Sequence, residues 1–358
     1  MKKIFIDAYT ELNLGDDLFI KILCERYPNH FFYIVCRRKN AEAFLNIKNL
    51  KVLYSFPYLD SLSKKASLWQ LLINNIAKKC DLVVNIGGSI FIEPSKWKKH
   101  VNKYKTRLKI NKPMYIIGSN FGPYKTEEFY KEYYHIFKNV TDICFRDEYS
   151  YKLFSKLSNT RLASDVVFTL NTANVELKNK ENNYIISVIN LENRADLAKY
   201  KDKYERKIEE ITSQLIKQGY RVTLMSFCEN EGDLESIKRI YKRLSDKVKD
   251  KTGIYNYTGN LNESLSIIKA SKGIVATRFH SMILGWLFNK NVYPIIYSQK
   301  TDNVLSDTNF LGDFVWMQEI DKIKVSSVLR QLLTGDKHDI DNEIHNAQKQ
   351  FLYLDKIL

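Results

Sequence analysis

Short apolar segments alternate with longer segments of helical period through most of the 358-residue chain. The short segments are rich in β-branched residues and the longer ones place apolar residues on one helical face, so the pattern predicts buried strands alternating with amphipathic helices. This alternation is typical of βαβ units and a parallel sheet. In the first half it predicts strands at residues 3–8, 31–36, 51–54, 81–86, 114–118 and 142–145, and helices at residues 16–26, 41–46, 62–78, 126–138 and 148–157.

A polar stretch without periodicity, at residues 173–183, predicts a linker, after which the alternation resumes. The second half predicts strands at residues 184–190, 220–226, 272–276 and 292–297, and helices at residues 201–217, 231–244, 261–270 and 281–289. We therefore expect an α/β protein with two doubly wound, Rossmann-like domains facing a cleft. Their predicted bounds are residues 1–172 and 184–335, followed by a helical tail at residues 336–358.

An excess of basic residues suggests anionic partners. The chain has 56 Lys and Arg against 41 Asp and Glu, a formal net charge of +15. Such an excess suits nucleic acid, a membrane surface, or a phosphorylated or acidic substrate. No helix-turn-helix, RNA-recognition or zinc-finger pattern is present, so we expect no nucleic-acid partner.

Hydropathy and cysteine spacing indicate the compartment. No apolar run approaches the roughly 18 to 20 residues that a membrane-spanning helix needs, and the first residues do not resemble a signal peptide. The five cysteines lie far apart without a C-x-x-C pair, which argues against a disulfide framework and against a structural zinc site. We therefore expect a cytoplasmic protein.

The first candidate motif follows the first predicted strand and opens the first helix. It contains Asn13, Gly15, Asp16 and Asp17. Gly15 permits a close approach of the backbone, and the two carboxylates can cap the helix or face a ligand. Adjacent Asp residues at a helix start diverge and no third ligand is evident, so we expect no metal here.

Two glycine-containing turns follow later strands of the first half. One contains Gly87, Gly88 and Ser89, and the other contains Asn120. Neither has the spacing of a dinucleotide fingerprint or of a Walker loop, so neither indicates NAD or ATP. They are interpreted either as tight turns or as places where backbone N–H groups approach an oxygen-rich ligand.

Basic groups follow three further strands. Arg146 ends one strand, and its planar fork matches a carboxylate or phosphate, with a structural Arg–Asp pair as the alternative. Arg278, His280 and Ser281 begin a helix after another strand, where a cation and an imidazole form an anion site with a proton-transfer group beside it. Lys300 follows the next strand, and we expect it to reach the same site.

Two carboxylates follow the strand at residues 220–226. Glu229 and Asp233 are interpreted as groups that face the same site, with a helix-capping role equally open for Asp233.

In this order, the motifs resemble those of the polysaccharide pyruvyl transferase family. The matching pieces are Asn13 to Asp17, Gly87-Gly88-Ser89, Gly118 to Pro123, Arg146-Asp147 with Ser150, Asp165, Arg278-Phe279-His280, and Tyr297 with Lys300. The chain departs from the family's pattern at Asp7 to Glu11, where a Gly-containing loop is usual, and in having two consecutive glycines in place of three.

The resemblance implies a fold like that of the GT-B glycosyltransferases, with phosphoenolpyruvate as donor, a sugar as acceptor and no metal or other cofactor. By position it implies that Arg146, His280 and Lys300 are the catalytic residues. We expect Arg278 and Ser281 to bind the donor. We expect the remaining motif residues to lie on the acceptor side or in the cleft. They are Asn13, Gly15, Asp16, Asp17, Gly87, Gly88, Ser89 and Asn120.

Other functions stay open at this point. A GT-B glycosyltransferase that uses a nucleotide sugar would also place basic groups and a helix N-terminus on a phosphate. A protein that binds sugar or nucleic acid without catalysis is a weaker alternative, because the three implied catalytic residues are all present.

The densest basic block, from Lys96 to Lys109, interleaves Trp and Tyr with Lys and Arg. We predict that it rests on an anionic membrane face or contacts a diphosphate-linked acceptor, which would make the protein peripheral on the inner face of the cytoplasmic membrane. A solvated surface is the alternative.

Overall fold

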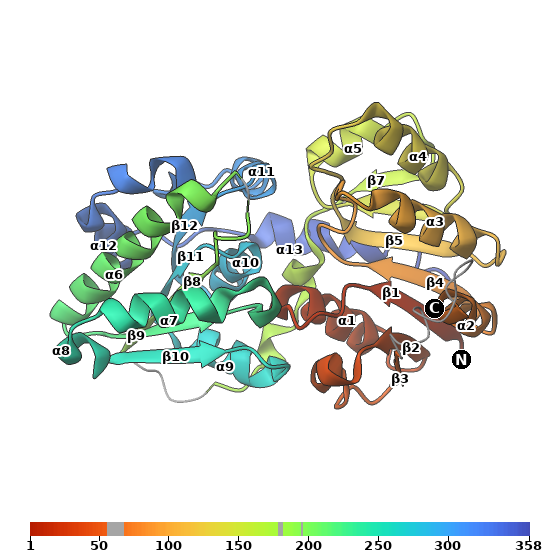
Figure 1. The fold of residues 1–358 in the computed structure, drawn as a ribbon. Coiled ribbons are helices and arrows are strands. Elements are labelled where there is room, and N and C mark those ends of the chain that lie inside the picture. The colour runs from red at the N-terminus through yellow and green to blue at the C-terminus, as the bar shows by residue number, and fades with distance from the viewer. Residues whose placement is uncertain (56–67, 178–181, 195) are drawn as a thin grey trace. The chain divides into compact units, whose positions relative to one another are not determined.

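The computed structural model describes residues 1–55, 68–177, 182–194 and 196–358. The chain divides into two compact units. The first unit consists of Met1–Thr10, Asp16–Thr169 and Glu343–Leu358, and the second of Glu11–Gly15 and Leu170–Asn342. Figure 1 shows a central sheet with helices on its faces in each unit.

The first unit contains a seven-stranded parallel sheet and its covering helices. The strands are β1 (Lys3–Ala8), β2 (Phe31–Cys36), β3 (Leu50–Tyr54), β4 (Leu82–Ile86), β5 (Met114–Ser119), β6 (Asp142–Phe145) and β7 (Thr160–Leu162). The helices are α1 (Leu14–Arg26), α2 (Leu68–Lys78), α3 (Trp97–Leu108), α4 (Glu127–Lys138) and α5 (Glu148–Phe154), with short 3₁₀ helices η1 (Arg38–Phe44), η3 (Val166–Thr169) and η8 (Gln348–Phe351).

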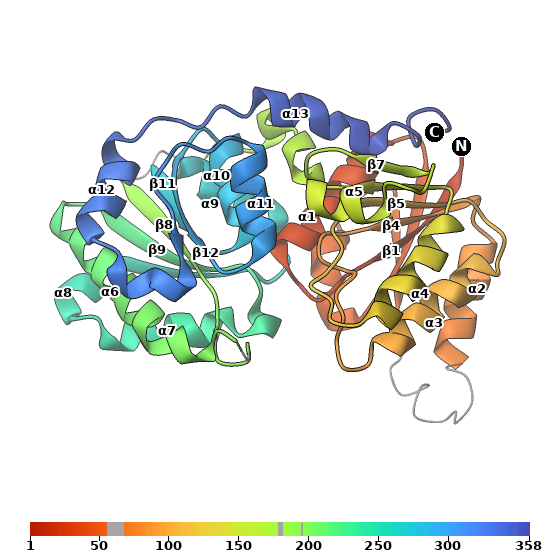
Figure 2. The same cartoon turned by 90° about the horizontal axis from the view of Figure 1, so that it is seen from above.

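The strand order of this sheet is β3-β2-β1-β4-β5-β6-β7. The order reverses between β1 and β4, which pair in parallel with Asp7 beside Asn85. At such a reversal the connecting helices leave to opposite faces and open a crevice at the carboxyl ends of the strands. The two views in Figures 1 and 2 agree with this, since α2, α3 and α4 cover one face and α1 the other.

Aromatic residues fill the core between α3, α4, α5 and the sheet. Phe121 lies against Phe129, Phe137 and Phe154, with ring centroids 4.9 to 6.1 Å apart. These rings are at most 2% exposed. The pairs of Phe121 with Phe137 and Phe154 are edge-to-face, and such contacts add about 0.5–1.5 kcal/mol each beyond the burial of apolar area.

The second unit contains a six-stranded parallel sheet. Its strands are β8 (Asn183–Val188), β9 (Arg221–Ser226), β10 (Thr252–Asn256), β11 (Gly273–Ala276), β12 (Asn291–Ile296) and β13 (Val315–Trp316). Its helices are α6 (Lys201–Lys217), α7 (Asp233–Arg243), α8 (Asp246–Lys249), α9 (Leu261–Ala270), α10 (Phe279–Leu287), α11 (Gln299–Asp307) and α12 (Val325–Thr334). A further helix, α13 (Asp341–Ala347), begins in the second unit and continues into the first. The short 3₁₀ helices are η4 (Thr172–Asn174), η5 (Ala198–Tyr200), η6 (Glu229–Glu231) and η7 (Met317–Lys322).

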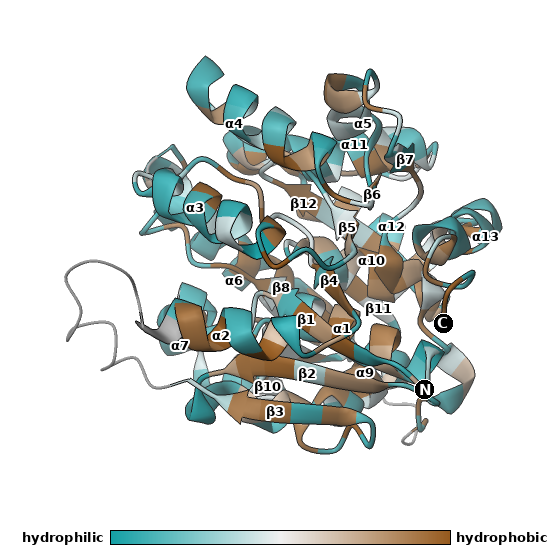
Figure 3. Cartoon of the chain, turned by 90° about the vertical axis from the view of Figure 1, so that its right-hand side faces the viewer, coloured by the Kyte–Doolittle hydropathy of each residue, from teal (hydrophilic) through white to brown (hydrophobic). Residues whose placement is uncertain are grey.

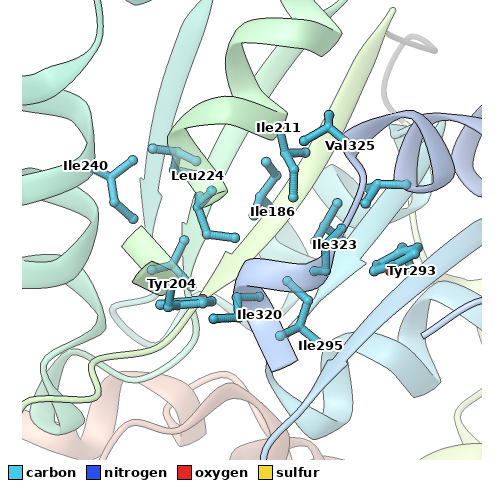
Figure 4. Close-up of a cluster of buried hydrophobic side chains, with 14 of the residues drawn as sticks. Ile186, Tyr204, Ile211, Leu224, Ile240, Tyr293, Ile295, Ile320, Ile323 and Val325 are labelled. Atoms are coloured by element: carbon cyan, nitrogen blue, oxygen red, sulfur yellow. The ribbon is translucent and has the colours of Figure 1, made fainter. Parts of the chain in front are cut away.

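The second sheet has the order β10-β9-β8-β11-β12-β13, so its order reverses between β8 and β11. One face packs on α6, α7 and α12 through a cluster of buried hydrophobic side chains, ten members of which are labelled in Figure 4. In Figure 3 the strands are mainly brown, whereas the helices carry teal as well as brown. This is the pattern of a sheet buried on both faces by amphipathic helices. The expectation of two doubly wound, Rossmann-like domains is thereby confirmed.

Several elements differ from those that the sequence predicts. The segment predicted as a helix at residues 41–46 forms the 3₁₀ helix η1, and the first part of the helix predicted at residues 62–78 lies outside the described residues. The pattern missed β7, β10, β13, α3, α8, α11 and α12. Two of these strands, β7 and β13, are only three and two residues long, too short to show a period.

The end of the chain belongs to the first unit, where the buried side chain of Gln350 holds it. Its amide oxygen accepts a hydrogen bond of 2.9 Å from the backbone N–H of Gly118. Its amide nitrogen donates to the carbonyl oxygens of Ala163 and Ser164 at 3.0 and 3.1 Å. These bonds satisfy a backbone N–H in the last part of β5 and two carbonyls just after β7, which would otherwise be buried without partners. The predicted tail at residues 336–358 therefore includes a structural part of the first unit.

Candidate active site

The helix start at Arg278 to Ser281 lies at the carboxyl edge of the second sheet, directly after β11. The hydroxyl oxygen of Ser187, near the end of β8, accepts hydrogen bonds from the backbone N–H groups of Thr277 and Arg278 at 2.9 and 3.1 Å. The Ser281 hydroxyl lies 2.7 Å from that of Ser187 and donates to the Arg278 carbonyl. Ser281 thus shapes the turn from a buried position, and its predicted contact with a donor stays a prediction.

Gly15 packs directly against the imidazole of His280. A Cβ atom at Gly15 would lie 1.8 Å from Nδ1 of His280, far inside van der Waals contact. Only glycine leaves room for the ring in this position. The close approach predicted for Gly15 is therefore made to a side chain of the same site.

The segment that carries Asn13 and Gly15 is fastened to the loop after β9. The Leu14 N–H donates to the Phe227 carbonyl at 3.0 Å, and the Asn230 side chain donates to the Glu11 carbonyl at 2.7 Å. Nδ2 of Asn13 lies 3.5 Å from a carboxylate oxygen of Glu231. Residues 11–15 are thus part of the second unit, although the sequence places them in the predicted first domain.

Arg278 is held by two carboxylates. Its guanidinium makes a bidentate contact with Asp233, including a bond of 2.9 Å from Nε, and donates to Glu231 at 2.7 Å. Burial disfavours the charged guanidinium, but the two carboxylates outweigh it and raise the pKa of Arg278. Because all three of its nitrogens already donate to carboxylates, we assign Arg278 a positioning role, and a direct donor contact stays a prediction.

Asp233 also accepts hydrogen bonds from the backbone N–H groups of Phe227 and Cys228, at 3.2 and 3.0 Å. It therefore joins the loop after β9 to the Arg278 turn after β11. Asp233 is the first residue of α7, and its fully buried carboxylate makes these structural contacts. That it faces a ligand stays a prediction. Glu229, the other predicted carboxylate, accepts from Asn256 at 2.6 Å.

Glu231 is shared among several cations. It accepts from Arg278 at 2.7 Å and from Arg194 at 2.8 Å. Burial by itself would raise the pKa of the Glu231 carboxyl, but Arg278, followed by Arg194 and Lys300, lowers it to about 2. The carboxylate is therefore charged throughout the neutral range.

Lys300 lies in the first turn of α11, after β12. Its Nζ atom lies 5.6 Å from the ring centroid of Phe279, whose ring centroid is 5.0 Å from that of His280. The second unit thus brings together Asn13, Gly15, Arg278, His280 and Lys300.

Arg146 belongs to a separate cluster in the first unit, at the carboxyl end of β6. It is 4% exposed and pairs with the equally buried Asp165 at 2.7 Å. It also donates to the side-chain oxygens of Asn120 and Ser89, at 2.6 and 3.2 Å. A Cβ atom at Gly88 would lie 2.5 Å from the guanidinium, so the glycine gives Arg146 its space.

Four predicted residues, Gly88, Ser89, Asn120 and Arg146, therefore meet in the first unit. The neighbouring Asp147 caps α5 by accepting from the Ser150 N–H at 2.8 Å. The Arg–Asp pair considered from the sequence exists, and its carboxylate comes from Asp165. That this cluster and the His280 cluster serve one reaction stays a prediction.

The remaining predicted residues take structural positions in the first unit. Asp16 and Asp17 lie in the first turn of α1, where carboxylates favour the positive end of the helix, and Asp17 is fully buried. The Gly87 carbonyl accepts from the Ser119 hydroxyl at 2.8 Å.

No metal centre is evident in the part of the chain that the structure describes, since no three His, Cys, Asp or Glu residues there are grouped to hold an ion. Within the same described residues, no helix combines the length and apolarity needed to cross a membrane.

Sequence reasoning missed two contacts of these clusters. It gave no role to Arg194, which lies in the loop after β8, and it quoted Asp165 without a partner. No local motif distinguishes Arg194. The only signal in the sequence is its place after a strand, because ligands of such sheets bind beyond the carboxyl ends of the strands.

Solved structures with this architecture are GT-B proteins. The chain is similar to *Anabaena* Alr3699/HepE in complex with UDP-glucose, with a TM-score of 0.62, 10% identity and complete coverage of both chains. It is also similar to the UDP-GlcNAc 2-epimerase of *Methanocaldococcus jannaschii*, with a TM-score of 0.61, 12% identity and coverage of 99% and 98%. The protein therefore has the GT-B fold, as expected.

Within that class, the chain belongs to the polysaccharide pyruvyl transferase family, whose model matches residues 13–299. It is 22% identical over 297 residues to the amylovoran biosynthesis protein AmsJ of *Erwinia amylovora*, covering 76% of this chain and 70% of AmsJ. The chain is thus a transferase of polysaccharide pyruvylation, and the family resemblance of the motifs is confirmed.

The shared carboxylate of Glu231 predicts a pH-dependent contribution to stability. Because its folded pKa of about 2 lies below the ordinary 4.5, the contribution is complete above pH 4.5 and is lost as the pH falls toward 2. The shift corresponds to at most about 3 kcal/mol. We expect Glu231→Gln to lower the melting temperature at pH 7, and the difference from wild type to shrink by pH 3.

Glu235→Gln is the matched control, because Glu235 is exposed on α7, the helix that follows Glu231 in the chain. We expect this substitution to leave the melting temperature close to that of wild type at both pH 7 and pH 3. A Glu231→Gln deficit of the same size at pH 7 and pH 3 would contradict the assignment.

Proposed function

We propose that the protein transfers the pyruvyl group of phosphoenolpyruvate onto two hydroxyls of a sugar, forming a pyruvate ketal on a cell-surface polysaccharide or its precursor. The observation that carries the proposal is the arrangement of His280. Its ring lies at the start of α10, fitted against Gly15, with Arg278, Lys300 and Arg194 gathered around one carboxylate nearby. Family membership supports the pyruvyl group, and the cations supply sites for an anionic donor.

The chemistry needs a proton donor and fixed positive charge. Protonation of the methylene carbon turns the enol phosphate into a cationic centre, which one sugar hydroxyl attacks. Loss of inorganic phosphate and attack by the second hydroxyl complete the ketal, so the acceptor gains one pyruvate less one water. Each hydroxyl releases a proton, which a base or the departing phosphate takes up.

Specific side chains fit these steps. We assign the proton transfers to His280, because the ring nitrogens of an imidazole can both donate and accept a proton. Lys300 and Arg146 would hold the carboxylate and phosphate of the donor, since charge fixed before the reaction stabilises charge that develops during it. Asp16 or Asp17 is the acceptor base that we would test first.

His280→Gln tests the assignment directly. We expect acceptor-dependent phosphate release from phosphoenolpyruvate to fall by about 10²- to 10⁴-fold in kcat, the usual contribution of a general acid–base group. Phosphate release and the mass of the saccharide product are measured together over a panel of saccharide acceptors, and a parallel series supplies nucleotide sugars.

His135→Gln is the control, because His135 is exposed near the end of α4 in the first unit. It should keep wild-type activity. Unchanged pyruvyl transfer by folded His280→Gln would contradict the mechanism. Wild-type transfer of a hexose from a nucleotide sugar, without use of phosphoenolpyruvate, would instead establish the glycosyltransferase alternative.

We further propose that the basic block at Lys96–Lys109 contacts an anionic membrane face, where the protein would lie peripherally on the cytoplasmic side. The block largely coincides with α3, which packs beside α2. Not all of its cations point outward. Lys103 pairs with the buried Asp7 at 2.5 Å, Lys105 pairs with Glu132 at 2.5 Å, and Arg107 is 2% exposed.

The outward-facing part of this surface includes Lys96 and Lys99, both exposed. The neighbouring helix α2 adds Leu71 and Leu72, which are 52% and 46% exposed. Exposed leucines beside lysines form the amphipathic combination that binds at a lipid interface.

The double substitution Lys96→Gln/Lys99→Gln tests this surface. Near an anionic membrane each Lys contributes about 1 kcal/mol, so we expect roughly a 10- to 30-fold loss of binding to vesicles with anionic lipid, and weaker wild-type binding in high salt. Co-sedimentation with the vesicles measures both effects.

Lys238→Gln/Lys242→Gln on α7 makes the same charge change on the second unit and should bind like wild type. Vesicle binding that is unchanged by high salt and by the α3 substitutions would refute the proposal that this surface contacts a membrane. If Lys96→Gln/Lys99→Gln weakens binding of a soluble diphosphate-linked sugar but leaves vesicle binding unchanged, the basic block contacts the acceptor and not the membrane.

A further inference from the structure

Arg194 occupies the position in the second unit at which a ligand is expected. It lies in the loop that follows β8, and β8 neighbours β11, whose following turn carries Arg278 and His280. The strand order reverses between these two strands, and in open α/β sheets ligands bind in the crevice beyond the carboxyl ends at that reversal.

Contacts from its own loop and from two other strand ends fix the Arg194 guanidinium in place. It donates to Glu231, after β9, at 2.8 Å, and its Nε donates to the Asn190 carbonyl at 3.3 Å. Its guanidinium carbon lies 5.1 Å from the ring centroid of Tyr297, which follows β12. A side chain held by a carboxylate, a carbonyl and an aromatic ring has lost most of its rotamer freedom before any ligand binds.

Exposure distinguishes Arg194 from Arg278. The Arg194 side chain is 30% exposed, whereas that of Arg278 is 8% exposed. Arg278 is buried between Asp233 and Glu231, so it stabilises the loop after β9 from the protein interior. Arg194 holds the same Glu231 from a position that a solute can reach.

The charges of this cluster do not balance. Arg194, Arg278 and Lys300 supply three positive charges, and Asp233 and Glu231 supply two negative ones, which leaves one positive charge before His280 is counted. Asp233 is paired with Arg278, and Glu231 is the counter-ion that Arg278 shares with Arg194 and Lys300. An anion entering beside these two cations would complete the balance.

We propose that Arg194 is an anion-binding residue of the donor site, where it takes the carboxylate or phosphate of a small substrate bearing both groups, and that Glu231 positions it. The inference rests on the proposed function, since it names a further contact to the same donor. Arg194 is not among the motif residues that the sequence analysis identified.

Arg194→Gln and Arg194→Lys test the inference. Loss of one charge-assisted contact to the donor corresponds to about a 10- to 100-fold rise in the KM for phosphoenolpyruvate. We expect this rise in Arg194→Gln with kcat within about threefold of wild type. Arg194→Lys should recover part of the loss, because it restores the charge without the planar fork.

Arg243→Gln is the matched control. Arg243 pairs with Glu205 and Glu209 at the other end of α7, and its side chain is 36% exposed. We expect its KM to equal that of wild type. Stabilisation of each protein by added phosphoenolpyruvate, inorganic phosphate or pyruvate, followed as a shift in melting temperature, reports binding without activity.

The two readouts separate the inference from the proposed function. If wild type does not transfer from phosphoenolpyruvate, the proposed function is wrong, and the melting shift with inorganic phosphate still tests Arg194 as an anion site. Equal stabilisation of wild type and Arg194→Gln by all three ligands would overturn the inference. A fall in kcat with unchanged KM would also overturn it.

Discussion

The shared carboxylate of Glu231 is the interaction on which the candidate site of the second unit depends. It receives Arg278 and Arg194, and Asn13 approaches it, so one side chain ties together loops that follow three strands and the segment at residues 11–15. Charges placed in a partly buried site are costly unless they are paired with good geometry. The loops are therefore fixed relative to one another by the same carboxylate that sets the charge of the site.

The first unit uses the same device with different residues. Arg146 leaves the end of β6 and is held by Asp165, with Asn120 and Ser89 completing its hydrogen bonds. In each unit a glycine allows the close approach of a proposed catalytic side chain, Gly88 for Arg146 and Gly15 for His280. A glycine, a basic group at a strand end and a buried carboxylate thus form a recurring arrangement at the carboxyl edges of both sheets.

Most of the fold could be predicted from the sequence, because long buried strands and amphipathic helices have clear patterns of apolar and polar residues. It could not predict β13, with two residues, or the return of Gln350 to the first unit, because such contacts depend on chain segments far apart in sequence. The motif residues were found because they follow strands in a recognisable order. Arg194 was missed because only the three-dimensional pairing with Glu231 and Tyr297 distinguishes it from other surface arginines.

The central claim, pyruvyl transfer that begins with protonation of an enol, is tested most directly by running the wild-type reaction in deuterated water. With phosphoenolpyruvate and a competent saccharide acceptor, the account predicts that the product methyl group carries one deuterium and that one phosphate is released per ketal, read by mass spectrometry and NMR. A product that keeps the vinyl group as an enolpyruvyl ether would contradict it. So would a product that gains a hexose while phosphoenolpyruvate is left unused.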